Sequence, residues 1–260
     1  MSLAVTRAVS PTIVQCELTH LAREPIDLAL ATAQHEAYEE LLRSLGATVL
    51  RAPAAPTMPD AVFVEDASVV LDEVAFLTRP GAASRRGETE GVGAALAPYR
   101  PLRTISAPAT LDGGDVLRIG RTLYVGRCAG GGRTNQAGLE QLAGLVAPFG
   151  YRVVPVDFSG CLHLKSAVTA LADDLVILNP DWVSAAAFVG CDAVLVDPSE
   201  PSAANTLRVG DTIVYPAHFP RTLERLGTRG LHIRTVANTE LAKAEGGVTC
   251  CSLIFEGKAE

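Results

Sequence analysis

The feature of this sequence that most constrains its fold is a repeated order of one helix followed by strands. Apolar residues recur at helical spacing from Ile26 to Leu45 and stop before Gly46, which predicts an amphipathic helix. Strand-like runs such as "ATVLRAP" and "AVFVEDASVV" come next. The same order recurs along the chain, and the predicted helices end near Gly46, Tyr99, Gly150, Gly190 and Gly227.

The interval between these helix ends is about 40 to 50 residues, which is typical of radial arrays and solenoids. "WVSAAAFVG", ending at Gly190, is the predicted helix of the fourth unit. The N-terminal run "SLAVTRAVS" is left over and would complete the last unit, closing a ring. Radial units of strands with one helix each protect sheet edges. We therefore predict an α/β fold, a five-bladed propeller of strand–helix repeats, with residues 1–260 forming a single domain.

Composition narrows the class of partner. The chain has 260 residues, of which 48% are hydrophobic, so it can bury a sizeable core. A net charge of -7 without a cluster of lysine or arginine argues against nucleic acid and anionic membranes. No apolar run approaches a membrane span, and the first ten residues lack the apolar core of a secretory signal. We expect a cytoplasmic protein with reduced thiols and a small polar ligand, and leave a homodimer open.

Polar residues recur at a comparable place in four units, after the first strand of each. They are Asp60, Glu65 and Asp66 in one unit, Asp112 and Asp115 in the next, then His163 and Lys165, and finally Cys250. In a radial array each unit contributes one loop to a shared centre. We therefore expect carboxylates, an imidazole and a thiol to converge there.

Cys250 and His163 are the candidate nucleophilic pair. A cysteine attacks as thiolate, and a nearby imidazolium lowers its pKa from about 8.5. Carboxylates can orient the histidine or hold a cationic substrate beside the sulfur. Residues alternate in a strand, so only one of Cys250 and Cys251 can face the centre, and we expect Cys251 to pack in the core.

Each candidate also has a purely structural interpretation. A cysteine in a strand usually packs in the core, and a buried histidine is usually hydrogen-bonded. "DGGD" from Asp112 to Asp115 is by default a glycine turn whose aspartates cap backbone groups. Arg85 and Arg133 would by default be solvated surface charges.

Metal and nucleotide sites are not indicated. Cys161, His163, Cys250 and Cys251 are potential zinc ligands, but the paired C-x-x-C spacing of a closed zinc site is missing. No glycine-rich nucleotide motif opens a helix. We predict neither a metal nor a cofactor.

Six motifs, taken together, resemble the dimethylarginine dimethylaminohydrolase family. In chain order they are "VFVEDASVV", "RPGAASRRGE", "LDGGDVL", "RTNQAG", "LHLKS" and "GGVTCCSL". The resemblance runs from about Leu18 to Phe255. This family belongs to the guanidino-group-modifying superfamily with the pentein fold, a five-bladed α/β propeller, in agreement with the five units.

The resemblance implies a role for each matching residue. Cys250 would be the nucleophile, His163 the acid and base, and Asp112 the residue that orients His163. The implied substrate-binding residues are Asp66, with Glu65 and Asp60 beside it, for the guanidinium; Arg85 and Arg133 for the carboxylate end; Leu18 in a loop that closes over the substrate; and the backbone carbonyl of Ala244 for the α-amino group.

The implied activity is hydrolysis of N-methylated arginines without a cofactor, from asymmetric dimethylarginine to citrulline and dimethylamine through a covalent thiouronium. Carboxylates match the N–H donors of a guanidinium. Arginine deiminases carry histidine-x-aspartate where this chain has His163 and Lys165. A dimethylated nitrogen has lost its N–H donors and would leave such an aspartate unsatisfied, which favours a methylated substrate. The alternatives are an arginine deiminase, a hydrolase of another guanidino compound, and a non-catalytic metabolite-binding pentein protein.

Overall fold

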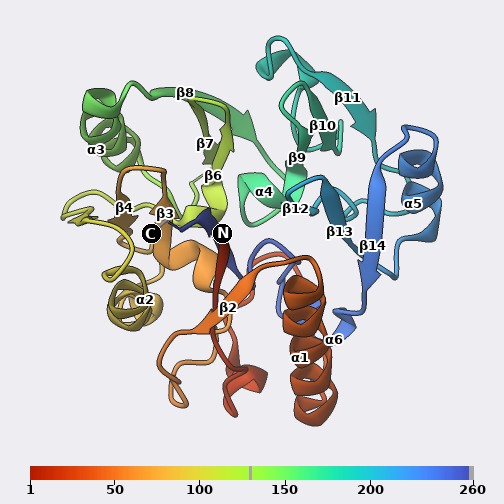
Figure 1. The fold of residues 1–260 in the computed structure, drawn as a ribbon, viewed down its shortest axis with the longest axis horizontal. Helices are drawn as coiled ribbons and strands as arrows, with labels where there is room; N and C mark the ends of the chain where they lie inside the picture. The colour runs from red at the N-terminus through yellow and green to blue at the C-terminus, as the bar shows by residue number, and fades with distance from the viewer. Residues whose placement is uncertain (129–130, 258–260) are drawn as a thin grey trace.

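Five three-stranded sheets surround a common centre in the computed structural model, which describes residues 1–128 and 131–257 (Figure 1). In every sheet the middle strand pairs antiparallel with one neighbour and parallel with the other. The longer helices lie on the outside of the ring (Figure 1). The fold is the predicted five-bladed α/β propeller.

The five blades are built from fifteen described strands. In blade order they are β15 (Leu253–Glu256), β1 (Ser2–Thr6) and β2 (Thr48–Arg51); β3 (Ser68–Val70), β4 (Ala75–Leu77) and β5 (Leu102–Thr104); β6 (Val116–Ile119), β7 (Thr122–Cys128) and β8 (Arg152–Phe158); β9 (Val168–Ala172), β10 (Leu175–Leu178) and β11 (Asp192–Leu195); β12 (Leu207–Val209), β13 (Thr212–Pro216) and β14 (His232–Val236).

Helices connect four of the five parallel strand pairs, because parallel neighbours need a crossover connection. The described α-helices are α1 (Leu28–Ser44), α2 (Glu88–Leu96), α3 (Gln136–Val146), α4 (Leu164–Ala167), α5 (Pro220–Gly227) and α6 (Thr239–Ala242). The Asp27 side chain caps the first turn of α1 by accepting the N–H of Leu30, and Gly46 follows the helix with a φ of 87°. Four crossovers therefore have the form that the sequence pattern predicts.

The fourth crossover differs from the prediction. "WVSAAAFVG" forms only the 3-10 turn η6 (Ala185–Ala187) instead of an α-helix. Val183 forms an antiparallel bridge with Phe158 at the end of β8, and the Ser159 N–H donates to the Trp182 carbonyl. This pairing holds the start of the segment extended, so only a short turn fits before β11.

The N-terminal strand closes the ring as predicted. In β1, Leu3 lies opposite Phe255 of β15 in antiparallel pairing and opposite Thr48 of β2 in parallel pairing. The two ends of the described chain therefore share one sheet. Among the described residues, no helix has the length and apolarity that crossing a membrane requires.

Buried apolar clusters fill the space between blades and helices. One cluster joins α3 to the second and third blades through Phe76, Leu111, Leu142 and Val146. Another surrounds α1. The first strands of the blades surround a central cavity of about 510 Å³. The polar residues singled out above cluster near one end of these strands.

Candidate active site

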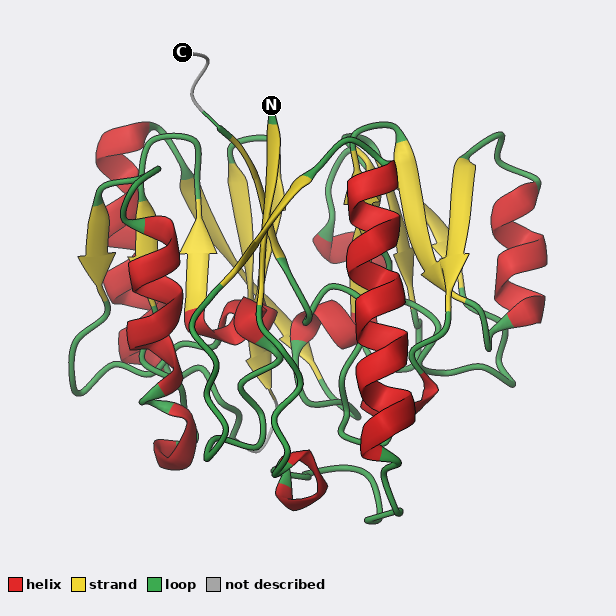
Figure 2. Cartoon of the chain, turned by 60° about the horizontal axis from the view of Figure 1, so that its bottom comes forward, coloured by secondary structure: helices red, strands yellow, loops and turns green. Residues whose placement is uncertain are grey.

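Short turns place the candidate side chains near one another. η2 (Val64–Ala67), η4 (Gly113–Asp115) and α4 directly precede the first strands β3, β6 and β9, and a turn at residues 248–251 precedes β15. Figure 2 shows short helical segments of this kind at one end of the strands. These side chains follow β2, β5, β8 and β14, the first strands of the predicted units, and they lie near one another, as the repeat predicted.

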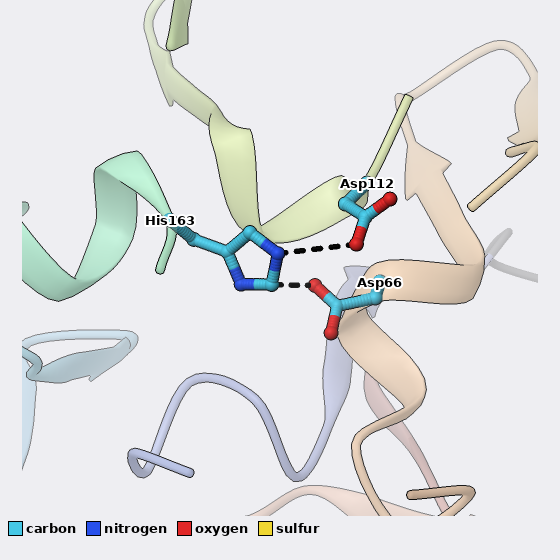
Figure 3. Close-up of side chains that lie close together, drawn as sticks. All are labelled: Asp66, Asp112 and His163. Carbon is cyan, nitrogen blue, oxygen red and sulfur yellow. Dashed lines mark hydrogen bonds and ion pairs between the residues drawn. The ribbon is translucent and has the colours of Figure 1, made fainter. Parts of the chain in front are cut away.

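The imidazole of His163 lies between two carboxylates (Figure 3). His163 Nε2 is 3.1 Å from Asp112 Oδ2, and His163 Nδ1 is 3.6 Å from Asp66 Oδ1. All three residues are buried. A histidine flanked by two ionised carboxylates favours the imidazolium form.

Backbone groups hold both carboxylates in place. Asp112 Oδ1 accepts the Gly81 N–H at 2.7 Å, and Asp66 Oδ1 accepts the Gly114 N–H at 2.9 Å. A Cβ on Gly114 would lie 2.6 Å from Asp66 Oδ1 and 2.7 Å from His163 Nδ1. The second glycine of "DGGD" is therefore required because the backbone approaches both side chains closely.

The charges around His163 control its protonation. Burial alone would lower its pKa, but the charge of Asp66 and the hydrogen bond and charge of Asp112 outweigh it and raise the pKa to about 9. In turn, the charges of His163 and Arg85 lower the pKa of Asp66 despite its burial. At neutral pH the histidine is therefore a proton donor beside two carboxylates.

Cys250 lies in the turn at residues 248–251, not in a strand as the alternating pattern predicted. The Tyr38 hydroxyl donates to the Val248 carbonyl at 2.9 Å, and the Asn205 Oδ1 accepts the Thr249 N–H at 3.0 Å, so the turn is held from two sides. The Gly247 N–H donates to Cys250 Sγ at 3.3 Å. Burial and the charges of Glu65 and Asp66 raise the Cys250 pKa to about 12.

Cys251 packs in the core, as expected. It is buried in the apolar cluster around α1, and its Sγ donates to the Gly247 carbonyl at 3.5 Å. Both cysteines belong to one turn, so their side chains point in different directions because of the turn geometry and not because residues alternate along a strand.

The catalytic pocket is a small cavity of about 10 Å³ that the candidates share. Its lining includes most of the predicted residues: Asp60, Asp66, Arg85, Arg133, His163, Ala244 and Cys250. Glu17, in the segment that contains Leu18, also lines this cavity.

Three predicted binding residues have surroundings that the sequence did not indicate. Glu65 faces the central cavity and accepts hydrogen bonds from Lys165 Nζ at 2.6 Å and from Thr249 Oγ1 at 2.8 Å. Leu18 packs against the apolar cluster around α1 and does not line the catalytic pocket. Arg85 is buried and donates from Nη1 to Asp66 Oδ2 at 2.6 Å, so it already neutralises this carboxylate.

Asp60 and Arg133 connect the pocket to the segment that contains Leu18. Asp60 accepts the Glu17 N–H, with Oδ2 at 3.1 Å, and burial raises the Asp60 pKa. Arg133 Nη2 donates to Thr19 Oγ1 at 3.3 Å. Both therefore contact the loop that the family resemblance identifies as mobile.

Asp115 caps a backbone group, as the structural interpretation of "DGGD" expected. Its Oδ1 accepts the Leu164 N–H at 3.0 Å, and its Oδ2 accepts a hydrogen bond from Thr134 Oγ1 at 2.6 Å. It thereby anchors the start of α4, directly after His163. Burial raises the Asp115 pKa to about 6. The signal was present in the sequence, since Asp115 is the second acid of "DGGD".

The acid–base residues also form a potential cation site. Within residues 1–128 and 131–257, the one group of three ligand atoms close enough for a metal is Asp66, Asp112 and His163, within 4.8 Å of one another. It contains none of the cysteines in the zinc alternative. Both carboxylates already accept backbone N–H groups, and Arg85 adds a positive charge at Asp66. These contacts favour proton transfer over metal binding.

The chain is similar to known proteins over most of its length. No protein-family model matches the chain. The chain is 44% identical over 251 residues to N(G),N(G)-dimethylarginine dimethylaminohydrolase of Streptomyces coelicolor, covering 96% of this chain and 95% of that protein. It is 33% identical over 239 residues to the protein of the same name in Pseudomonas aeruginosa, covering 91% and 92%.

Solved structures extend the likeness to the fold. A cysteine-to-serine mutant of the Pseudomonas aeruginosa protein, complexed with citrulline, matches with a TM-score of 0.91 at 31% identity, covering 97% of this chain and 98% of that chain. The N-terminal domain of ArgZ, bound covalently to a reaction intermediate, matches with a TM-score of 0.85. At 20% identity the second match shows a shared fold only.

Proposed function

The chain belongs to the dimethylarginine dimethylaminohydrolase family, and from that premise we propose that it hydrolyses N-methylated arginines to citrulline and a methylamine with Cys250 as the nucleophile. The observation that carries this proposal is the shared lining of one small pocket by Cys250, His163 and Asp66. A thiol, a protonated imidazole and a carboxylate are the groups that attack on a guanidinium requires.

Binding would bring a cation to the buried thiol. In the free protein the Cys250 pKa of about 12 keeps the thiol protonated at neutral pH. A guanidinium seated against Asp66 and Asp60 places a positive charge beside the sulfur, which favours the thiolate. The thiol proton leaves to solvent as the substrate binds. Substrate binding therefore activates its own nucleophile.

The first chemical step forms the covalent intermediate. The Cys250 thiolate adds to the guanidinium carbon, the bond from this carbon to the methylated nitrogen breaks, and the imidazolium of His163 gives its proton to the departing amine. A thiouronium remains on Cys250. The His163 pKa of about 9 supports this step, because the acid must be protonated at neutral pH.

The second step releases the product. The now neutral His163 removes a proton from water, which adds to the thiouronium carbon, and the carbon–sulfur bond breaks. The remaining proton of the added hydroxyl passes to the departing sulfur, so citrulline leaves and the Cys250 thiol and the His163 imidazolium of the free protein are restored. The Asp112 carboxylate is 3.1 Å from His163 Nε2, and it stabilises the imidazolium that gives its proton in the first step and the imidazolium that forms in the second.

A methylated substrate is favoured over arginine. Lys165 follows His163 where the deiminases carry an aspartate, and its Nζ is paired with Glu65 on the side of the central cavity. No carboxylate two residues after His163 is available to the leaving nitrogen. We also propose that Arg133 contributes to binding the substrate carboxylate, since Arg85 is already engaged by Asp66.

Product analysis tests the function. Purified protein is incubated with asymmetric dimethylarginine and, separately, with arginine, and citrulline, dimethylamine and ammonia are measured. We expect citrulline and dimethylamine from the methylated substrate, and no turnover by Cys250→Ser. Citrulline and ammonia from arginine alone would instead identify a deiminase. Binding of either compound without product would favour a metabolite-binding protein. Cys251→Ser is the matched control, because it removes a neighbouring thiol that lies outside the catalytic pocket.

A further inference from the structure

Arg85 is a buried cation beside the carboxylate that the proposed reaction needs. Its side chain is 5% exposed, and its Nη1 donates to Asp66 Oδ2 at 2.6 Å. Asp66 is also the carboxylate proposed to receive the substrate guanidinium. A carboxylate paired with a single arginine forms a neutral unit, which attracts a second cation weakly. Recognition of a cation at Asp66 therefore requires a further group that compensates the charge of Arg85.

Glu88 is placed to compensate this charge. Arg85 Nε donates to Glu88 Oε1 at 3.1 Å, and Arg85 Nη2 donates to Glu88 Oε2 at 2.8 Å. This bidentate pairing matches the planar fork of a guanidinium to a carboxylate. Both oxygens accept N–H donors, which is the arrangement of the ionised form. Glu88 is 3% exposed, so salt and bulk water screen this pair little.

The surrounding chain fixes Glu88 where it can hold Arg85. Glu88 is the first residue of α2 and follows Arg85, the last residue of the turn η3 (Ala83–Arg85), by three positions. Arg7 Nη2 donates to the Glu88 carbonyl at 3.0 Å, and Arg7 Nη1 donates to the Ala61 carbonyl at 3.2 Å. Arg7 therefore ties the start of α2 to the segment that leads into η2.

The contacts divide the N–H donors of Arg85 between two sides. Nη2 also donates to the backbone carbonyls of Asp60 at 3.3 Å and Phe63 at 3.2 Å. Nε and Nη2 are thus held on the side of Glu88, and Nη1 is left for Asp66. Asp66 and Glu88 together carry two negative charges against the one positive charge of Arg85. One negative charge therefore remains on this unit.

We propose that Glu88 is a positioning residue of the active site. It holds the Arg85 guanidinium by one edge and balances its charge, so that Asp66 retains the negative charge that recognises a cationic substrate. Glu88 does not line the catalytic pocket, so it acts on the substrate through Arg85. The proposal rests on the proposed function, because it takes Asp66 as the carboxylate that receives the substrate guanidinium.

The test compares a cationic and a neutral reagent at one thiol. Cys250 is alkylated with the cation 2-chloroacetamidine and, separately, with iodoacetamide, and peptide mass spectrometry gives the ratio of the two second-order rate constants. The cationic reagent has no carboxylate, so the ratio does not depend on which residue binds that end of the substrate. Neither reaction requires turnover. A parent protein with a high ratio that forms no citrulline would contradict the proposed function and leave this proposal standing.

Glu88→Gln removes the charge and keeps the size of the side chain. We expect the ratio to fall about tenfold, the order expected for one lost charge in a partly buried site, while the iodoacetamide rate stays within about threefold of the parent's. A merely structural defect would change both rates together. With asymmetric dimethylarginine, KM should rise about tenfold and kcat should stay within about threefold. An unchanged ratio in folded Glu88→Gln, or equal rates with both reagents in the parent, would overturn the proposal.

Two further variants separate the charge of Glu88 from its shape. Glu88→Asp keeps the carboxylate, so we expect a ratio close to the parent's. A loss as large as that of Glu88→Gln would contradict a role for the charge. Glu90→Gln changes an exposed carboxylate on the same helix and is the matched control, which should behave as the parent does.

A double variant gives a second test if Glu88→Gln alone fails to fold. Arg85→Gln combined with Glu88→Gln removes both partners of the buried ion pair, so neither charge is left unpaired. Asp66 then keeps its own negative charge, and the net charge of the unit equals that of the parent. We expect a ratio close to the parent's. A ratio about tenfold lower in the folded double variant would contradict charge compensation by Glu88.

Discussion

Replacing Asp112 by asparagine isolates the charge that keeps His163 protonated. The substitution keeps an oxygen that can accept the Gly81 N–H, as Asp112 Oδ1 does at 2.7 Å, and it places an uncharged amide toward His163 Nε2. The pKa of His163 stands at about 9, compared with an ordinary value of 6.5. Asp66 remains on the other side of the ring, so we expect a partial and not a complete fall of this pKa.

The magnitude follows from the hydrogen bond. A hydrogen bond to a charged group contributes about 1.5–3 kcal/mol, and one pKa unit corresponds to about 1.4 kcal/mol. The His163 pKa should therefore fall by about one to two units in Asp112→Asn. The proposed mechanism uses His163 as the acid, so it predicts that the alkaline limb of the kcat profile moves to lower pH by the same amount.

Two measurements check this prediction. The His163 titration is followed by NMR, and the pH dependence of kcat is measured with asymmetric dimethylarginine. Asp157→Asn, an exposed carboxylate paired with Arg127, is the control and should change neither. If Asp112→Asn folds but leaves both the titration and the alkaline limb unchanged, Asp112 does not control the acid.

The same charge pair links pH to stability. The pKa of His163 is higher in the folded chain than in the unfolded chain. Its contribution to the free energy of unfolding is therefore complete below about pH 6.5 and is lost as pH rises through about 9. Asp112→Asn should therefore lower the free energy of unfolding by about 1.5–3 kcal/mol near pH 6 and by less near pH 9. Urea titrations at the two pH values measure the difference. An equal loss at both would contradict the linkage.

Three further predictions concern other parts of the site. Gly114→Ala should reduce kcat strongly while the fold persists, because a Cβ at this position would contact His163 and Asp66. Gly144→Ala on α3 is the control, since a Cβ there has no atom within 4 Å. Equal activity of the two variants would refute the packing argument. Lys165→Met should lower the free energy of unfolding by about 3–5 kcal/mol, because it leaves Glu65 buried without its cation. A decrease below about 1 kcal/mol, measured by denaturant unfolding, would contradict this prediction. Cys250 should react slowly with iodoacetamide at pH 7 because its pKa is about 12, and much faster with the cationic 2-chloroacetamidine. Peptide mass spectrometry measures both rates of alkylation at Cys250. Equal rates would argue against a cation site.

The radial fold was predictable because each unit carries a local signal. Helical periodicity before a glycine and short strand-like runs depend on neighbouring residues, and they located α1, α3 and α5 within a few residues. The form of the fourth crossover could not be predicted from local sequence, because it depends on pairing between Val183 and Phe158, which are remote in sequence. The turn at Cys250 was misassigned to a strand for a related reason, since the contact with Tyr38 that holds it spans 210 residues.

The sequence predicted which residues lie near one another at the candidate site, but it did not predict the contacts that each of them makes. The position of Cys250, His163, Asp112 and Asp66 within the repeat was enough to expect them together. The sequence did not reveal that Glu65 pairs with Lys165 on the other side, because side-chain direction in a short turn follows from packing.

The most direct test of the central claim is to look for the covalent intermediate on Cys250. Protein turning over asymmetric dimethylarginine is quenched in acid, digested and analysed by peptide mass spectrometry. The proposed mechanism predicts a substrate-derived thiouronium on the peptide that contains Cys250 and Cys251, located at Cys250 by fragmentation and absent from Cys250→Ser. An adduct that persists in Cys250→Ser, or one located at Cys251, would contradict Cys250 as the nucleophile.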